Sequence, residues 1–333
     1  MSLANIIGQD KAIHMLQGVV RRKRAASSYL FCGEPGIGKK TAAINFIKAL
    51  NCTKPGTDGL HLSSEASGDA CDECESCQKI ESGSHPDFLL VSPTERQIRI
   101  EEVRAIDEAL SFRPFEGSRK AVIVDDAELM NIPAANAFLK TLEEPPDESV
   151  IILVSSRPDL LPATIRSRCS RICFSPLSSE ACRKVLNGKL PDASLEAAVR
   201  LSMGRPGVAL SVDFMEEREW FLELFKGMLK ADKDSWSSRE DMERWFEYAL
   251  VLFRDIAVYS ETGSGTALIN ADLKEYLSGL SKSAGLKVII TLYQEMVLLK
   301  GLLMFNLNKS ITWNYTSSLL RKELVMNKGT GHK

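Results

Sequence analysis

The chain contains 333 residues, of which 44% are hydrophobic and 26% are charged, and its formal net charge at pH 7 is −2. This length predicts two or three domains. The near-neutral charge excludes a basic field over the whole surface that would attract nucleic acid. Any contact with DNA must therefore come from partner chains or from a local patch. The basic run at residues 21–24 is such a patch, although runs of this kind are more often solvated helix ends.

The sequence carries no sign of a membrane or secretory protein. No apolar run is long enough to cross a bilayer, and the first residues lack the pattern of a signal peptide. We therefore expect a cytoplasmic protein without a membrane partner. The eight cysteines of such a chain are more often metal ligands or core residues than disulfides.

The first chemical motif is a glycine-rich turn between a predicted strand and a predicted helix. The apolar run 29–32 predicts the strand, and residues 41–50 predict the helix. The turn contains Gly33, Gly36 and Gly38. Glycines let backbone N–H groups approach phosphate oxygens, and the helix N-terminus adds positive potential. Lys39 follows at the position that reaches the terminal phosphates, so the segment predicts nucleotide binding.

One position departs from this phosphate-binding pattern. The pattern has Ser or Thr directly after the lysine, where the hydroxyl holds Mg²⁺. Here Lys40 occupies that position and Thr41 comes one residue later. A shift in register that brings Thr41 to the metal and a site without this metal contact both stay open. A retained turn that binds no nucleotide is the third alternative.

Cysteines after this helix predict a structural metal site. The predicted ligands are Cys52, Cys71, Cys74 and Cys77. Short gaps let one turn supply several thiolates to a tetrahedral Zn²⁺, and a full set of four sulfur ligands leaves no position for a substrate. We therefore predict a zinc module over residues 52–77. His61 is an alternative ligand, reduced free thiols are the alternative without a metal, and iron would accept the same donors.

The second chemical motif is a pair of acids after a predicted strand. The strand covers residues 121–124 and is followed by Asp125 and Asp126, at the end where a parallel sheet presents groups to a nucleotide. In nucleotide hydrolases the first acid helps to hold Mg²⁺, and the next, usually Glu, orients the attacking water. Asp126 is one methylene shorter, and a misplacement of about 1 Å can lower a rate about a hundredfold. The alternative is that both acids only cap the strand and begin a turn.

Strands and helices alternate through the first half of the chain. Residues 88–91, 150–155 and 172–174 predict further strands, and residues 98–110 and 134–142 predict helices between them. This alternation predicts an α/β domain over residues 1–175, with a parallel sheet covered by helices on both faces.

The rest of the chain is predicted to be helical. Short helical patterns cover residues 179–186, 195–202 and 208–213. Stripes of large apolar residues then predict an all-α bundle over residues 213–333.

Together these features resemble the clamp-loader branch of the AAA+ ATPases. The likeness covers essentially the whole chain and is most specific over residues 120–170. The stretches that carry it are residues 6–9, 71–77, 85–87 and 135–146. Ser167–Arg168–Cys169 is similar to the family's signature for an arginine that is presented to a neighbouring subunit, and Ser156 lies at the family's position for a polar sensor.

The resemblance implies an AAA+ P-loop domain, a small helical lid over residues 176–212 and a C-terminal collar over residues 213–333 through which subunits assemble. It implies a five-membered ring with ATP-hydrolysing motor subunits (gamma/tau) and delta. That ring uses ATP to open a sliding clamp and close it on primed DNA. In the ring, Arg168 would complete the ATP site of the adjacent motor subunit.

Three departures distinguish the chain from a motor subunit. A motor subunit has Thr where Lys40 stands, Glu where Asp126 stands and a lid arginine where Gly207 stands. The changes affect the metal, the water and the transition-state charge, so we predict a degenerate nucleotide site with weak or absent ATPase activity and an arginine that acts in trans. Two other functions stay open, namely the motor subunit itself and a P-loop kinase of a small metabolite. A kinase function would not explain the cysteine cluster or the long helical C-terminal region.

Overall fold

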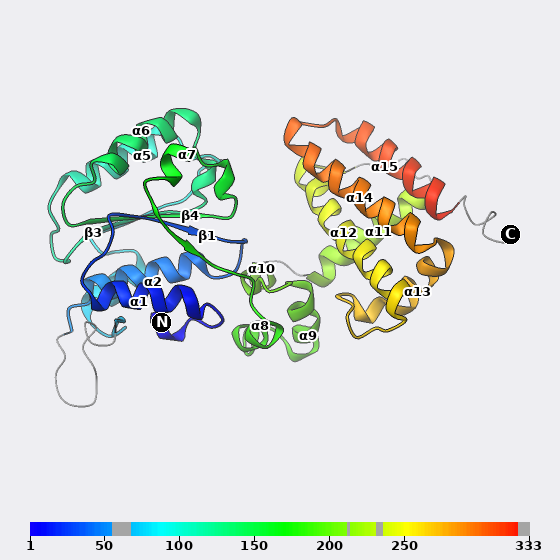
Figure 1. Cartoon of the computed structure of the whole chain (residues 1–333), viewed down its shortest axis with the longest axis horizontal. Helices are drawn as coiled ribbons and strands as arrows, with labels where there is room; N and C mark the ends of the chain where they lie inside the picture. The colour runs from blue at the N-terminus through cyan, green and yellow to red at the C-terminus, as the bar shows by residue number, and fades with distance from the viewer. Residues whose placement is uncertain (55–67, 212–213, 231–235, 326–333) are drawn as a thin grey trace. The chain divides into compact units, whose positions relative to one another are not determined.

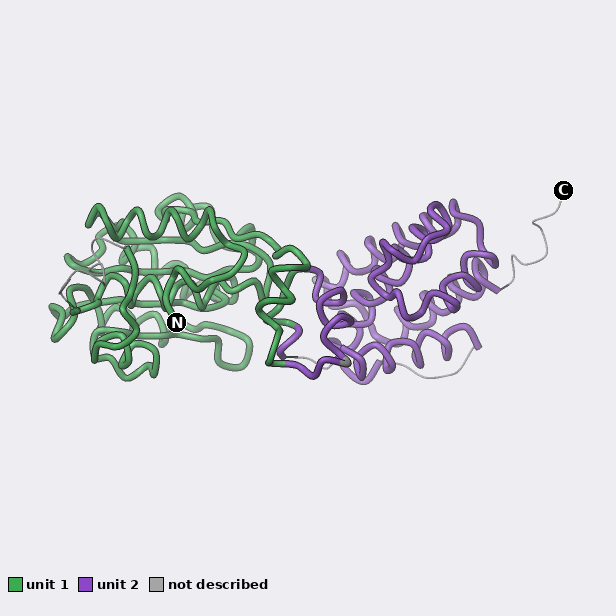
Figure 2. The backbone as a smooth tube through the Cα atoms, turned by 90° about the horizontal axis from the view of Figure 1, so that it is seen from below, with its two compact units in different colours: residues 1–189, 204–208 green, residues 190–203, 209–333 purple. Residues whose placement is uncertain are grey.

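The computed structural model of the chain describes residues 1–54, 68–211, 214–230 and 236–325. The chain divides into two compact units, shown in Figure 2. Unit 1 comprises residues 1–189 and 204–208, and unit 2 comprises residues 190–203 and 209–333. Among the described residues no helix has both the length and the apolar character that crossing a bilayer requires. His61, the alternative metal ligand, lies outside the described residues.

Unit 1 is built on a five-stranded sheet in the order β2-β3-β4-β1-β5, in which all pairs are parallel. The strands are β1 Ser28–Cys32, β2 Phe88–Val91, β3 Lys120–Val124, β4 Ser149–Ser155 and β5 Ser170–Cys173. The central strands β1 and β4 are buried along their whole length, which explains their unbroken apolar sequence. Because β3, β4 and β1 are parallel neighbours, their carboxyl ends lie together at one edge of the sheet.

Helices cover both faces of this sheet (Figure 1). One face carries α1 Asp10–Arg21 and α2 Lys39–Asn51, and α4 Glu75–Ser82 packs against α2. The other face carries α5 Ile100–Ser111, α6 Ile132–Glu143 and α7 Ala163–Arg166. Successive side chains of β1 serve the two faces, because Tyr29 stacks edge-on with Phe46 of α2 at 5.3 Å while Leu30 joins the core beneath α5 and α6.

Local signals in the sequence set the ends of these helices. The Asn131 side chain accepts the Ala134 N–H at 2.9 Å and so caps the start of α6. The same helix ends at Glu143, just before the two prolines at residues 145–146. The helix α2 begins after Gly38, whose φ of +96° suits glycine best.

Two short helices follow the sheet. They are α8 Ser179–Leu186, in unit 1, and α10 Pro206–Ser211. Among the described residues of unit 2, the regular elements are all helices. Its other helices are α9 Asp192–Leu201, α11 Phe214–Lys230, α12 Arg239–Thr262, α13 Lys274–Ser283, α14 Leu286–Leu302 and α15 Lys309–Leu324.

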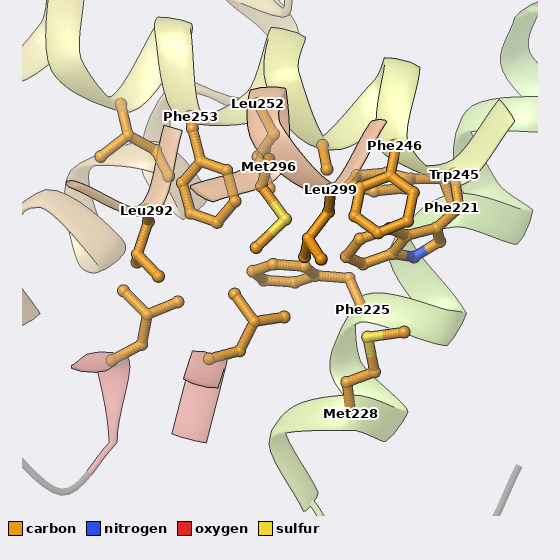
Figure 3. Packing of buried hydrophobic residues seen from close by; sticks show 14 of the residues in the cluster. Phe221, Phe225, Met228, Trp245, Phe246, Leu252, Phe253, Leu292, Met296 and Leu299 are labelled. Carbon is orange, nitrogen blue, oxygen red and sulfur yellow. The ribbon is translucent and has the colours of Figure 1, made fainter. Parts of the chain in front are cut away.

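An aromatic cluster forms the core of unit 2 (Figure 3). Phe221 and Phe225 of α11 point toward Trp245 and Phe253 of α12, and Met296 of α14 closes the cluster. The ring centroids of Phe221 and Trp245 are 5.6 Å apart, a separation typical of favourable aromatic pairs. The predicted α/β domain with a helical C-terminal region is thus confirmed, while the lid and collar boundaries at residues 176, 212 and 213 stay predictions.

Candidate nucleotide site and metal centre

The glycine-rich turn joins β1 to α2 in a conformation that requires its glycines. Gly33, Gly36 and Gly38 all have positive φ values, of 147°, 74° and 96°. A Cβ on Gly33 would lie 2.5 Å from the Phe174 carbonyl oxygen, so a larger residue does not fit there. The strand, loop and helix that the sequence predicts are confirmed.

Lys39 is turned into its own loop. Only 6% of its surface is exposed, and its Nζ donates to the carbonyl oxygens of Gly33 at 2.7 Å and Glu34 at 2.6 Å. Burial lowers the pKa of Lys39, and the carboxylates of Glu128, Asp126 and Asp125 act in the opposite direction. The loop itself therefore satisfies the amine that the motif assigns to phosphate.

Lys40 pairs with the first acid of the second motif. Its Nζ lies 3.0 Å from Asp125 Oδ2, which joins the first turn of α2 to the end of β3. The helix begins at Lys39 without an inserted residue, so Thr41 stays one position further along and is exposed. Lys40 thus occupies the sequence position of the metal-binding hydroxyl in the pattern and pairs with the acid that the pattern assigns to the same metal.

Asp126 and Glu128 extend the acidic group beyond Asp125. Asp126 has a left-handed backbone, with φ of 44°, that is uncommon outside glycine. Burial raises the pKa of Asp126, and the negative charges of Asp125 and Glu128 raise it further. The three carboxylates lie close enough to influence one another and the amine of Lys39.

Ser156, the predicted sensor, is bound to Glu128 rather than free. Its hydroxyl and its N–H donate to Glu128 Oε1 at 2.8 and 3.0 Å, and the N–H of Arg157 donates at 3.1 Å. Burial acts to raise the pKa of Glu128, but the hydrogen bonds that it accepts outweigh burial and lower it. Sequence reasoning did not assign a role to Glu128. Its position three residues after the first acid of the motif was the available signal.

The predicted nucleotide-site residues thus converge at one edge of the sheet, at the carboxyl ends of β1, β3 and β4. The start of α10, which belongs to unit 1, closes over this loop. The Gly207 N–H donates to the Gly36 carbonyl at 2.8 Å, and a Cβ on Gly207 would lie 2.9 Å from Gly36 backbone atoms. Arg205 Nε lies 3.8 Å from Glu34 Oε2. Gly207, one of the three predicted departures, therefore makes a tight backbone contact with the loop.

Arg168 lies on the surface between α7 and β5, with a third of its side chain (33%) exposed. Its guanidinium donates to the Thr164 carbonyl at 2.8 Å and to Glu143 Oε1 at 2.5 Å. These partners belong to α7 and α6, so they tie the arginine to both helices.

The predicted cysteines come together as a possible metal centre. The sulfurs of Cys52, Cys71, Cys74 and Cys77 all lie within 4.8 Å of one another. The Cys52–Cys74 and Cys71–Cys77 pairs are each 4.0 Å apart, and four sulfurs about 2.3 Å from a tetrahedral Zn²⁺ would be about 3.8 Å apart. The hydrogen bond between Cys77 and Cys52 lowers the pKa of Cys52 and raises the pKa of Cys77. This donor set fits a structural zinc ion.

The stretch at residues 85–87 fastens this cysteine module to the sheet. The Asp87 N–H donates to Nδ1 of buried His85 at 3.0 Å, so Nε2 carries the ring proton and faces Ser76 Oγ at 3.2 Å. Ser76 Oγ in turn donates to the Asn51 carbonyl at 2.8 Å. This chain of hydrogen bonds connects the start of β2, the helix α4 and the end of α2.

Comparison with known proteins identifies the family. A family model described as "DNA polymerase III, delta subunit" matches residues 8–178. The DNA polymerase III subunit delta' of Pseudomonas aeruginosa is 32% identical over 79% of this chain and 81% of its own length. The chain belongs to the DNA polymerase III delta' family. The delta' subunit of Bacillus subtilis is 29% identical over 80% of this chain and 82% of its own length.

The chain is also similar to a second DNA polymerase III subunit, tau. The DNA polymerase III subunit tau of Bacillus subtilis is 34% identical over 57% of this chain, and the match spans 31% of tau. The similarity to tau therefore covers little more than half of this chain. The similarity to the delta' relatives covers most of this chain and most of each relative.

Proposed function

We propose that this chain acts as the delta' subunit of the DNA polymerase III clamp loader. In this proposal it joins motor subunits of the gamma/tau type and delta in a ring of five in the bacterial cytoplasm. The ring opens the sliding clamp and closes it on primed DNA. The delta' relatives, which match about four-fifths of both chains (79% and 81% for Pseudomonas aeruginosa), support this assignment.

The nucleotide site of the chain is degenerate in this proposal, and the Lys40–Asp125 ion pair is the observation that carries it. The Lys40 Nζ lies 3.0 Å from Asp125 Oδ2. A Mg²⁺ ion that bound Asp125 would have to displace Lys40. Lys39 is already bonded to two loop carbonyls. Both groups that the motif assigns to metal and phosphate thus have protein partners, so the subunit itself hydrolyses ATP weakly or not at all.

Arg168 acts in trans in this proposal. Its partner Glu143 is about half exposed (51%), and an exposed ion pair of this kind contributes only about 0–1 kcal/mol. A γ-phosphate on a neighbouring subunit can therefore replace Glu143 at little cost. A guanidinium at a transferring phosphate accelerates hydrolysis about 10³-fold or more.

Unit 2 supplies the collar contact in this proposal. Ile290, Tyr293 and Val297 are three and four residues apart on α14, so they share one face of the helix. Their exposed fractions are 44%, 39% and 47%, whereas the core residues of the same helix are buried. An exposed apolar stripe on an assembled subunit is typical of an interface between chains.

The test is assembly followed by turnover. The purified chain is mixed with tau and delta, separated by gel filtration and assayed for ATP hydrolysis alone and in the complex. We expect co-elution with both partners and hydrolysis only when tau is present. Brisk hydrolysis by the isolated chain would instead identify a motor subunit. Phosphoryl transfer to a small metabolite without co-elution would identify the kinase alternative.

A further inference from the structure

Two thiols outside the cysteine module lie side by side on neighbouring strands. Cys32 ends β1, Cys173 ends β5, and the parallel ladder pairs them directly. Their sulfurs are 3.2 Å apart. Paired strands run about 4.8 Å apart, which falls within the roughly 4.4–6.8 Å that a disulfide spans between α-carbons. The backbone therefore already has the spacing that a bond between the two sulfurs needs.

The two thiols differ in access, and a cation contacts the inner one. Cys173 is exposed, whereas Cys32 is only 3% exposed. Arg171 Nε donates to Cys32 Sγ at 3.1 Å. Burial raises the pKa of Cys32, and the contact with Arg171 acts in the opposite direction. An oxidant from solvent can thus reach Cys173 first, while the sulfur of the buried Cys32 lies beside it and in contact with the Arg171 guanidinium.

The pair also lies at the base of the glycine-rich turn. Cys32 directly precedes Gly33, and the Phe174 N–H donates to the Cys32 carbonyl at 2.8 Å. These contacts hold the backbones of both cysteines in register at the ends of their strands. A bond between the sulfurs would therefore require side-chain rotation without a rearrangement of the sheet.

We propose that Cys32 and Cys173 are a peroxide-sensitive thiol pair that forms a reversible disulfide. The Cys173 thiolate attacks one peroxide oxygen, the O–O bond breaks, and the departing hydroxide takes a proton to become water. The Cys32 thiolate then attacks the resulting sulfenic sulfur, forms the S–S bond and displaces a second hydroxide, which also becomes water. The two sulfurs together give two electrons to one peroxide. A dithiol such as dithiothreitol returns those electrons and restores both thiols.

The test uses the full zinc-loaded chain treated with hydrogen peroxide, followed by alkylation of the remaining thiols and digestion with trypsin. Cys32 falls in the peptide 25–39, and Cys173 falls in the peptide 172–183 together with the buried Cys182. Fragment ions must therefore assign the bond to Cys173 rather than Cys182. We expect a cross-link between Cys32 and Cys173 that dithiothreitol removes.

Matched variants complete the experiment. Cys173→Ser should abolish the cross-link and leave Cys32 as an alkylated thiol, whereas Cys169→Ser, four positions earlier, should behave as the unaltered chain does. Circular dichroism checks that each variant is folded. The proposal is overturned if peroxide leaves Cys32 as a free thiol in the unaltered chain, or if Cys32 bonds to a different cysteine.

Discussion

The Lys40 Nζ lies 3.0 Å from Asp125 Oδ2, so the residue that follows the loop lysine neutralises the acid at the end of β3. The acid that the pattern assigns to Mg²⁺ thus has a protein cation as its partner. This contact also gives a structural reason for the departure from the phosphate-binding pattern at Lys40, which is otherwise only a mismatch in sequence.

Replacement of this lysine should restore a dependence on the metal. Lys40→Thr frees Asp125 and supplies a hydroxyl, so we expect the Kd for Mg·ATP to fall about five- to tenfold, which corresponds to the roughly 1 kcal/mol of a partly exposed ion pair. Isothermal titration with and without Mg²⁺ measures the effect. Lys40→Met is the matched control, because it removes the charge without adding a metal ligand. Equal gains in both variants would show that Mg²⁺ is not involved.

Asp87 should make the stability of unit 1 depend on acid. Its carboxylate accepts the N–H groups of Phe115, Glu116 and Gly117 at 2.8, 2.9 and 2.8 Å. Burial acts to raise the pKa of Asp87, but these donors and Lys120 outweigh it and lower the pKa. Because the folded-state pKa lies below the unfolded value of about 3.9, the stabilisation is present above that pH and is lost as the pH falls through the folded-state pKa.

Asp87→Asn should therefore lower the free energy of unfolding at pH 7 by about 2–4 kcal/mol, because hydrogen bonds to a buried charge are lost. The difference in the free energy of unfolding between the unaltered chain and Asp87→Asn should become smaller as the pH approaches 3. The control is Asp159→Asn, because the Asp159 side chain is 88% exposed and should change stability by less than about 1 kcal/mol. Denaturant unfolding between pH 3 and 7 tests both variants. A loss that is independent of pH would contradict the assigned role of the carboxylate.

The cysteine module should hold one zinc ion per chain. We expect elemental analysis to find zinc rather than iron, and Cys77→Ser to lose most of it together with thermal stability. Cys77 is the buried member of the set, and its replacement leaves three sulfur ligands. Cys169→Ser should keep the metal. A full zinc content in the Cys77 variant would contradict the four-sulfur site.

The stripe on α14 should be needed for assembly but not for folding. Val297→Asp places a charge on the exposed apolar face, so we expect co-elution with tau and delta to be lost while the thermal midpoint of the isolated chain changes little. Thr291→Asp is the control, because Thr291 is exposed on a different side of the same helix. If both variants still assemble, another surface forms the contact.

Much of the fold followed from sequence because local signals and burial agree. The apolar run at residues 29–32 became the fully buried β1, and the prolines at residues 145–146 follow the end of α6. The spacing of the cysteines likewise predicted the cluster that the structure brings together. These features depend on neighbours in sequence or on a simple periodicity.

The contacts that sequence could not predict join distant segments. Nothing in the local pattern indicates that Glu128 binds Ser156 or that Gly207 meets Gly36, since both depend on how the strands and the start of α10 are arranged. The Lys40–Asp125 pair could not be predicted either, because Lys40 is a departure from the pattern, Asp125 matches it, and their contact depends on the fold that brings α2 and β3 together.

ATP turnover by the reconstituted clamp loader tests the central claim most directly, which is that Arg168 serves a neighbouring subunit. DNA-stimulated hydrolysis is compared between complexes that contain the unaltered chain, Arg168→Ala or Arg166→Ala. Arg166 is a suitable control because it lies on α7 and pairs with exposed Asp159. We predict that Arg168→Ala assembles normally but slows ATP hydrolysis at the adjacent site about 10³-fold or more. The total ATP turnover of the complex then falls by the fraction that this site contributes. Arg166→Ala should retain full turnover. Unchanged turnover in a complete complex with Arg168→Ala would contradict the account.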